Sequence, residues 1–423
     1  MSIDKLPVEL LIAIFEDVQQ QETKPEHSTH CSPQWRVIRQ VCRRWHDIAD
    51  DHPKLWQAVD VLPSKHVLDW GSLCLSKSGT GGLELRFHTP HAMREVCNAL
   101  YAHAERIQKI SAWGEETIRG LHALRRLFLL NLPNVQELHF HFDDNLPWAR
   151  DIYALDTRFV LTELLGELSP ARLPALHTIS LRGIFLPWQS PIIRNLRVLR
   201  VDRWEENPAV SHEPYDVPSD RFLHVLASCP KLETLSLNVT NTDPHLRPPR
   251  HHSTLPVNHF ESRALFVPLL AHIRLDPACS VALNGSTGTF DTAAPAYADF
   301  LPAPALAAQS FPALARAVAA TWHGLTAFSC HTGADEGGAE LRLEVKDGRE
   351  EQRRAPPYPD EALARFCEYM KEAPRLARLT LCACVSKEAY AGPRGRGGAG
   401  RRVPGAAKEG GRAGTFVCAR EES

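Results

Sequence analysis

Several histidine and cysteine residues near the start of the chain are of the types that bind zinc. His27, His30 and Cys31 lie in a polar segment, and Cys42 and His46 follow in a stretch with helical periodicity. A structural zinc site usually takes two close pairs of such ligands at standard spacings. Only Cys42 and His46 have roughly the spacing of one pair, and Cys42 belongs to the apolar stripe of its helix. We therefore expect no metal ion and no cofactor.

The sequence gives no support for catalysis. GRGGAG at 395–400 has the letters of a dinucleotide-binding loop, but low-complexity sequence flanks it where that loop needs a strand and a helix. The G-x-S-x-G, P-loop and H-E-x-x-H motifs are absent from the sequence. We expect a protein that is not an enzyme. A catalytic site hidden in one of the insertions is the alternative.

The composition is that of a globular protein with more than one folding unit. The chain has 423 residues and a mass of 47.3 kDa, with 43% apolar and 23% charged residues. One core rarely extends beyond about 250–300 residues, so we expect two or three units. The formal net charge of -2 argues against nucleic acid and against an anionic membrane as partners.

Cysteine use and hydropathy predict a protein of the cytoplasm or nucleus. The first residues, MSIDKLPVELL, carry acids and lack the cleavage site of a secretory signal. The 11 cysteines are scattered without a framework, which is typical of reduced thiols. The sequence holds no apolar run long enough for a membrane-spanning helix.

The first element of the chain is an unusually apolar helix. In LPVELLIAIFEDV, residues 6–18, apolar residues recur at the spacing of a helix face. Pro7 suits a helix start, and Glu9 places negative charge at the positive end of the helix dipole. The pattern predicts a helix from about Pro7 to Val18. Val8 and Ile12 extend the apolar surface to the other side, and such a helix normally needs a cover.

A second helical stretch follows a polar loop at 19–34. Residues 35–56, WRVIRQVCRRWHDIADDHPKLW, again place apolar residues at helical spacing, and Pro53 ends the segment. These elements predict a small helical domain over 1–61. A unit of this size rarely supplies enough core to stand alone.

A short apolar phrase recurs in the rest of the chain. It reads VQELHF, LHTISL, LRVLRV, LETLSL and LARLTL, beginning at residues 135, 176, 196, 232 and 376. FLHVLASCP, residues 222–230, predicts a helix and turn that lead into one of these phrases. A helix followed by a short strand is the unit of a leucine-rich repeat, in which strands form a parallel sheet with helices behind it.

The predicted repeat region covers 62–385 and contains long insertions. Segments at 205–220, 240–258 and 285–309 are rich in proline or alanine and interrupt the repeats. The Gly/Arg-rich remainder, 386–423, is too poor in apolar residues to fold, and we expect it to be disordered. The predicted fold class is therefore α/β: a small all-α domain, an irregular leucine-rich-repeat-like solenoid and a disordered tail.

The helical domain resembles the F-box over residues 3–60. The family pattern is Leu-Pro-x-Glu-Leu-Leu, Ile-Phe, Val-Cys-Arg-x-Trp and Pro-x-Leu-Trp, and it stands here as Leu6, Pro7, Glu9, Leu10, Leu11, Ile14, Phe15, Val41, Cys42, Arg43, Trp45, Pro53, Leu55 and Trp56. The insert at 19–34 is longer than the usual connection. An F-box before irregular repeats is similar to a large class of fungal F-box proteins.

The resemblance implies a partner that covers the apolar helix. In F-box proteins this unit docks on the Skp-type adaptor of a Skp–cullin–F-box (SCF) ubiquitin ligase. The implied contact residues, or the residues that hold the contacting helices, are Leu6, Pro7, Leu10, Ile14, Val41, Cys42 and Trp45. The alternative is that the helix packs on the repeat region as ordinary core.

The function implied by the resemblance is substrate recruitment for ubiquitylation. The repeats would hold a protein substrate on the concave strand face or through insertions, while the F-box carries it to the Skp adaptor and, through it, to the cullin. Candidate substrate-binding residues lie between the inward leucines: Arg182, Arg197, Arg200, Thr234 and Asn238. A Skp-bound scaffold outside any ligase is the alternative from another class.

Overall fold

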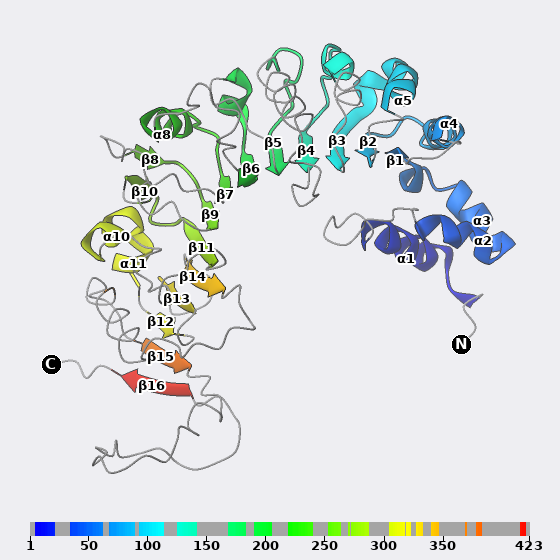
Figure 1. The fold of residues 1–423 in the computed structure, drawn as a ribbon. Coiled ribbons are helices and arrows are strands. Elements are labelled where there is room, and N and C mark those ends of the chain that lie inside the picture. The colour runs from blue at the N-terminus through cyan, green and yellow to red at the C-terminus, as the bar shows by residue number, and fades with distance from the viewer. Residues whose placement is uncertain are drawn as a thin grey trace, which may run out of the picture. The chain divides into compact units, whose positions relative to one another are not determined.

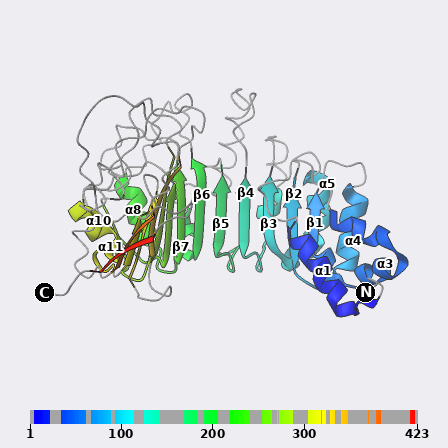
Figure 2. The same ribbon diagram turned by 90° about the horizontal axis from the view of Figure 1, so that it is seen from below.

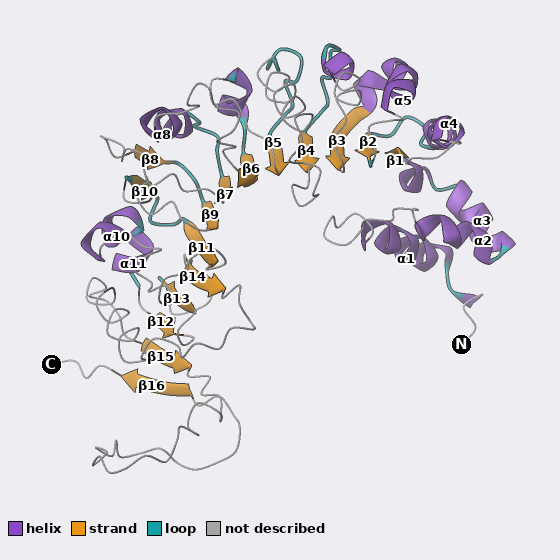
Figure 3. Cartoon of the chain, viewed as in Figure 1, coloured by secondary structure: helices purple, strands orange, loops and turns teal. Residues whose placement is uncertain are grey.

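The computed structural model describes residues 5–21, 34–61, 67–88, 93–113, 125–141, 168–182, 190–204, 219–239, 253–263, 270, 272–286, 304–317, 319–322, 327–332, 340–346, 369, 378–382 and 415–419. The chain divides into two compact units. Unit 1 comprises Met1–Tyr215 with Ser228–Ser236, and unit 2 comprises Asp216–Ala227 with Leu237–Ser423. Figure 1 labels the elements and Figure 3 shows their types.

Unit 1 begins with the predicted helical domain. Helix α1 (Val8–Gln21) is followed by η2 (Gln34–Val37), α2 (Ile38–Val41), α3 (Arg43–Asp50) and η3 (Pro53–Trp56). The stretch after the loop is thus not one helix. Cys42 adopts an extended backbone conformation (φ -160°, ψ 166°) and separates α2 from α3.

Aromatic side chains form the core of this helical domain. Trp35 and Trp56 are fully buried and meet edge to face, with ring centroids 5.4 Å apart. Trp70 joins them from helix α4 (Val67–Lys77), at 5.6 Å from Trp56. Trp56 also donates a hydrogen bond from Nε1 to the Ala49 carbonyl, at 2.8 Å. Because Trp70 lies beyond residue 61, the helical domain shares its core with the region that follows.

Six parallel strands continue unit 1. They are β1 (Ala58–Val61), β2 (Leu83–Phe87), β3 (Ile107–Trp113), β4 (Glu137–His141), β5 (Thr178–Arg182) and β6 (Val198–Trp204), each paired with the next. Strands β3 to β6 lie side by side in Figure 2. Strand β1 falls within the range we predicted to be all-α, because η3 leads directly into a strand that pairs with β2.

The strand register sorts the side chains of this sheet into two faces. One face holds two continuous buried rows: Val59, Leu85, Ile110, Leu138, Ile179 and Leu199, and beside it Val61, Phe87, Ala112, Phe140, Leu181 and Val201. Helices α4 and α5 (Met93–Leu100) lie on one side of the strands (Figure 1). Since side chains alternate along a strand, the intervening positions form the opposite face, which is polar.

Unit 2 combines parallel and antiparallel strands. Its sheet contains β9 (His259–Arg263), β11 (Ser280–Ser286), β14 (Glu340–Lys346), β13 (Ala327–His331), β12 (Ala319–Trp322), β15 (Arg378–Cys382) and β16 (Thr415–Ala419), in that order. Strands β8 (Ser253–Leu255) and β10 (Ile273–Leu275) form a separate parallel pair. Helices α8 (Ser219–Ala227), α10 (Pro304–Ser310) and α11 (Pro312–Ala315) complete the unit.

The recurring phrases all contribute strands, which confirms the α/β arrangement. They form β4, β5, β6, β7 (Thr234–Val239) and β15, and the predicted helix at 222–230 corresponds to α8. The parallel repeat pattern fails at β12, β13 and β14, which pair antiparallel. Only four residues connect β12 to β13, whereas a parallel crossover needs a dozen or more.

The predicted disordered tail holds one strand. Strand β16 pairs antiparallel with β15, so the prediction is wrong for residues 415–419. Phe416, Val417 and Cys418 form an apolar run with an aromatic and a β-branched residue, which suits a strand. The rest of 386–423 lies outside the described residues, as do most of the predicted insertions. Among the described residues, no helix has the length and apolar character needed to cross a membrane.

Candidate protein-interaction surfaces

Apolar side chains on α1 and around α2 stand exposed on the surface of the helical domain. We call this the apolar patch; it comprises Val8 (41% exposed), Leu10 (52%), Ile14 (43%), Val37 (58%) and Val41 (54%). Single exposed apolar residues are common on protein surfaces, but five large ones within one small domain make that domain a candidate for interaction. The patch is therefore a candidate docking surface.

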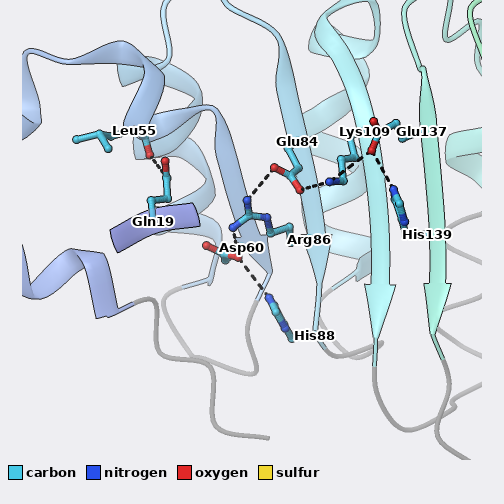
Figure 4. Close-up of polar contacts among 9 residues, drawn as sticks. All are labelled: Gln19, Leu55, Asp60, Glu84, Arg86, His88, Lys109, Glu137 and His139. Atoms are coloured by element: carbon cyan, nitrogen blue, oxygen red, sulfur yellow. Dashed lines mark hydrogen bonds and ion pairs between the residues drawn. The ribbon is translucent and has the colours of Figure 1, made fainter. Parts of the chain in front are cut away.

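The buried side of α1 fixes this helix in place. Leu11 and Phe15 are fully buried, and the Phe15 ring lies 5.1 Å from that of Trp45 on α3. Gln19 donates a hydrogen bond from Nε2 to the Leu55 carbonyl at 2.7 Å (Figure 4). Leu11 and Phe15 are spaced as one helix face, and Leu10 and Ile14, one position before each of them, share the adjacent face, which is exposed.

Polar contacts hold both ends of α1. Glu16 lies 2.9 Å from His52 Nε2 and 2.7 Å from Lys54 Nζ, and hydrogen bonds from these two side chains lower the pKa of its carboxyl. Near the other end, Arg44 donates a hydrogen bond to the Leu6 carbonyl at 2.7 Å. The apolar patch is thus presented by a fixed helix.

The structure divides the seven predicted Skp-contacting residues into two groups. Leu10, Ile14 and Val41 belong to the apolar patch, and Pro7 is exposed at the start of α1. Leu6, Cys42 and Trp45 are partly buried; Trp45 packs on Phe15, and Cys42 separates α2 from α3. Their positions fit the role of holding the contacting helices.

Sequence reasoning missed Val8 and Val37 as members of the apolar patch. Val8 was visible only as part of the helix that is apolar all round, and Val37 lies outside the family pattern. The spacing of Val37 and Val41, four residues apart, was the available signal, because residues at this spacing share a helix face.

The polar face of the first sheet carries a chain of ion pairs. Asp60 lies 3.9 Å from Arg86, and Arg86 lies 2.7 Å from Glu84. Lys109 then bridges Glu84 at 3.2 Å and Glu137 at 3.5 Å (Figure 4). The chain connects β1, β2, β3 and β4 across the sheet, with three acidic groups held by two basic ones.

Histidines extend this network along the polar face. His139 Nε2 lies 3.0 Å from Glu137, and His88 Nε2 lies 3.3 Å from Asp60. The His88 ring stacks on Trp113, with centroids 5.1 Å apart and planes 19° apart. His141 meets the other side of Trp113 edge to face, at 6.5 Å, and its Nε2 lies 3.2 Å from Ser180 Oγ.

The environment shifts the pKa values of several groups on this face. The contact with His139 lowers the pKa of Glu137 to about 2. Burial raises the pKa of Glu84, but contacts with Arg86 and Lys109 outweigh it, and the net shift is downward. Burial lowers the pKa of His141 to about 4; His139 and Arg182 add to this shift, and Asp202 opposes it. His141 is therefore neutral at pH 7.

The predicted substrate-binding residues continue along the same sheet. Arg182 ends β5 and lies 3.7 Å from Asp202, while Arg200 is exposed on β6. Arg197 forms a 2.7 Å ion pair with Glu233. Thr234 and Asn238 lie on β7, and Thr234 is partly buried. The ion-paired and aromatic residues of β1 to β4 were missed, because nothing local in the sequence shows that these strands are neighbours.

Among the described residues, no group of three or more histidine, cysteine or acidic side chains is placed to hold a metal ion. His27, His30 and Cys31 lie outside the described residues. His46 is exposed on α3, and Cys42 is a free thiol.

A comparison with known families identifies the kind of domain that carries the apolar patch. A family model described as F-box-like matches residues 3–61, the range that contains α1, α2, α3, η3 and β1. The chain therefore carries an N-terminal F-box-like domain, a class of domain that generally binds the Skp adaptor of SCF complexes. A comparison of the chain with curated proteins found no match.

Proposed function

We propose that this protein is the substrate-recognition subunit of an SCF ubiquitin ligase. The observation that carries the proposal is the apolar patch, which lies within the F-box-like range and is exposed although α1 is fixed by its buried side. The Skp adaptor supplies the cover for this patch. Burial of apolar surface stabilises such a complex by roughly 25 cal/mol per Å² removed from water, before the costs of association.

The strands that follow the F-box-like domain would hold the substrate. Short parallel strands in sequential order, with stacked apolar rows on one face, support a leucine-rich-repeat-type array in unit 1. Its polar face offers charged and aromatic side chains to a protein partner. The chain itself contributes no chemistry; it raises the effective concentration of the substrate beside the ligase enzymes. This role places the protein in the cytoplasm or nucleus.

Co-expression with the Skp adaptor tests the docking step. In the variant Leu10→Glu, a charge replaces an exposed apolar side chain in the first turn of α1, so we expect loss of co-purification with the fold retained. The matched control is Leu68→Glu on α4, where the leucine is 44% exposed but lies outside the F-box-like range. The control should co-purify as the unchanged chain does.

The outcomes separate the candidate functions. Equal co-purification of both variants would show that the apolar patch does not dock the adaptor. Capture of the Skp adaptor without a cullin, in the same preparation, would favour the Skp-bound scaffold over the ligase subunit.

A further inference from the structure

The apolar patch is assembled from two parts of the chain that a long connection separates. Leu10 and Ile14 lie on α1, whereas Val37 and Val41 lie on η2 and α2. Residues 22–33 stand between the two parts, and a connection of this length can span many different distances. Tertiary contacts must therefore set where Val37 and Val41 lie.

Helix α4, which follows the F-box-like range, packs against η2. The Trp70 ring meets Trp35 and Trp56, at centroid distances of 6.0 and 5.6 Å, and both partners are fully buried. The Arg36 guanidinium lies over the same Trp70 ring, 3.3 Å from its centre. A cation over an aromatic face is attracted to the ring. Because Trp35 and Arg36 directly precede Val37, these contacts hold the start of the segment that carries the second half of the patch.

Ion pairs connect α4 to the other end of this segment. Lys77, in the last turn of α4, lies 3.1 Å from Asp50 on α3, and Asp50 lies 2.7 Å from Arg39 on α2. Burial raises the pKa of Asp50, but hydrogen bonds from Lys77 and Arg39 outweigh it, and the net shift is downward. Both contacts thus favour the ionised carboxylate. Arg39 stands between Val37 and Val41, so α4 supports both of these patch residues.

We infer that α4 positions the η2–α2 half of the apolar patch for the Skp adaptor, with Trp70 as the principal positioning residue. Trp70 does not belong to the patch and acts on Val37 and Val41 through η2. The part of the chain needed for docking then extends to residue 77, beyond the matched range of 3–61. The inference rests on the proposed function, because the adaptor is the partner that covers the patch.

The rate at which the adaptor leaves the co-purified complex of the full chain measures the effect of Trp70. Trp70→Leu keeps an apolar side chain but loses the ring under Arg36, so Val37 and Val41 are held less firmly. We expect about tenfold faster dissociation during exchange against excess labelled adaptor. Trp70→Phe restores a ring and should recover most of the slow dissociation. The matched control is Leu68→Ala on the same helix, where the leucine is 44% exposed; it should dissociate as the unchanged chain does.

A cycle of combined substitutions separates positioning from a general loss of stability. In a background of Val37→Ala with Val41→Ala, we expect Trp70→Leu to accelerate dissociation less than about threefold, because the side chains that Trp70 positions are already truncated. In a Leu10→Ala background the acceleration should stay about tenfold, since α1 is held by its own buried side.

The outcomes distinguish failure of this inference from failure of the proposed function. Equal acceleration by Trp70→Leu in all three backgrounds, or no acceleration in the unchanged background, would overturn the positioning role while adaptor docking stands. Where Trp70→Leu gives no folded complex by circular dichroism, Lys77→Gln, which loses the ion pair with Asp50, takes its place in the cycle. Absence of adaptor binding by the unchanged chain would overturn the proposed function, and this inference with it.

Discussion

At the scale of single residues, the polar face of strands β1 to β4 carries acidic and basic side chains that compensate one another's charge. Glu84 lies between Arg86 and Lys109, and its lowered pKa reports that both cations stabilise the ionised carboxylate. Substitution of Glu84 would remove one of the two partners of both Arg86 and Lys109 in a half-buried setting, which is more costly than the loss of an exposed pair.

At the residue scale, His141 should make the stability of the folded chain depend on pH. Its pKa is depressed to about 4 in the folded chain, against about 6.5 when unfolded, so the unfolded state takes up a proton first as the pH falls. Stability should therefore decrease from about pH 6.5 to 4, by at most about 3 kcal/mol. His141→Gln removes this contribution. Urea denaturation at pH 7 and 4.5 should show a smaller loss for the variant than for the unchanged chain, and an equal loss would contradict the assignment.

Cysteine reactivity provides a second residue-scale prediction. Cys74, Cys229, Cys279 and Cys330 are buried, and burial raises the pKa of their thiols to between about 11 and about 12. Cys42 is partly exposed in the F-box-like domain. Iodoacetamide at pH 7.5 should modify Cys42 and leave these four thiols unmodified until the chain is unfolded, as mass spectrometry of the peptides would show. Adaptor binding should slow the modification of Cys42.

At the scale of elements, α1 divides its residues between folding and docking. Phe15 is fully buried against Trp45, whereas Leu10 and Ile14 face outward. The helix thus needs both a core within the chain and a cover from outside, and the two requirements are separable by substitution.

Phe15→Ala tests the folding side of α1. Removal of a buried phenylalanine typically costs about 3–5 kcal/mol, so the F-box-like domain should unfold at lower temperature. The thermal unfolding transition, followed by circular dichroism, would measure the loss. Ile14→Ala, four-tenths exposed, serves as the comparison and should change stability little. A similar loss in both variants would show that the two faces are not distinct.

At the scale of the whole molecule, segments of the two compact units alternate along the sequence. Helix α8 belongs to unit 2, yet Ser228–Ser236 directly after it belongs to unit 1. In unit 1, the Glu233 and Thr234 amides both donate hydrogen bonds to the Arg197 carbonyl. The bounds that we predicted for the repeat region, 62–385, stay a prediction.

Two truncations test the contribution of 228–236 to unit 1. A chain of residues 1–240 retains this segment, and a chain of residues 1–215 loses the Arg197 hydrogen bonds together with buried Leu232 and Leu235. We expect the shorter chain to unfold at lower temperature and to give less soluble complex with the Skp adaptor. Equal unfolding temperatures would show that the segment contributes nothing to unit 1.

The sequence alone determined some of the elements of this protein and the family of its first domain. Helical periodicity located α1, and the L-x-x-L-x-L phrases located five strands, because the spacing of apolar residues follows the period of each element. The F-box pattern identified the domain because several rare residues occur in order. These signals are local, so they are readable without knowledge of the fold.

The tertiary structure alone decided which residues of these elements meet. Glu84 and Lys109, or Trp113 and His141, become neighbours only through the strand register, which depends on contacts between distant parts of the chain. For the same reason the sequence missed the antiparallel pairing of β13 and the exposure of Val37. The direction of each side chain follows from packing, and packing is a property of the whole unit.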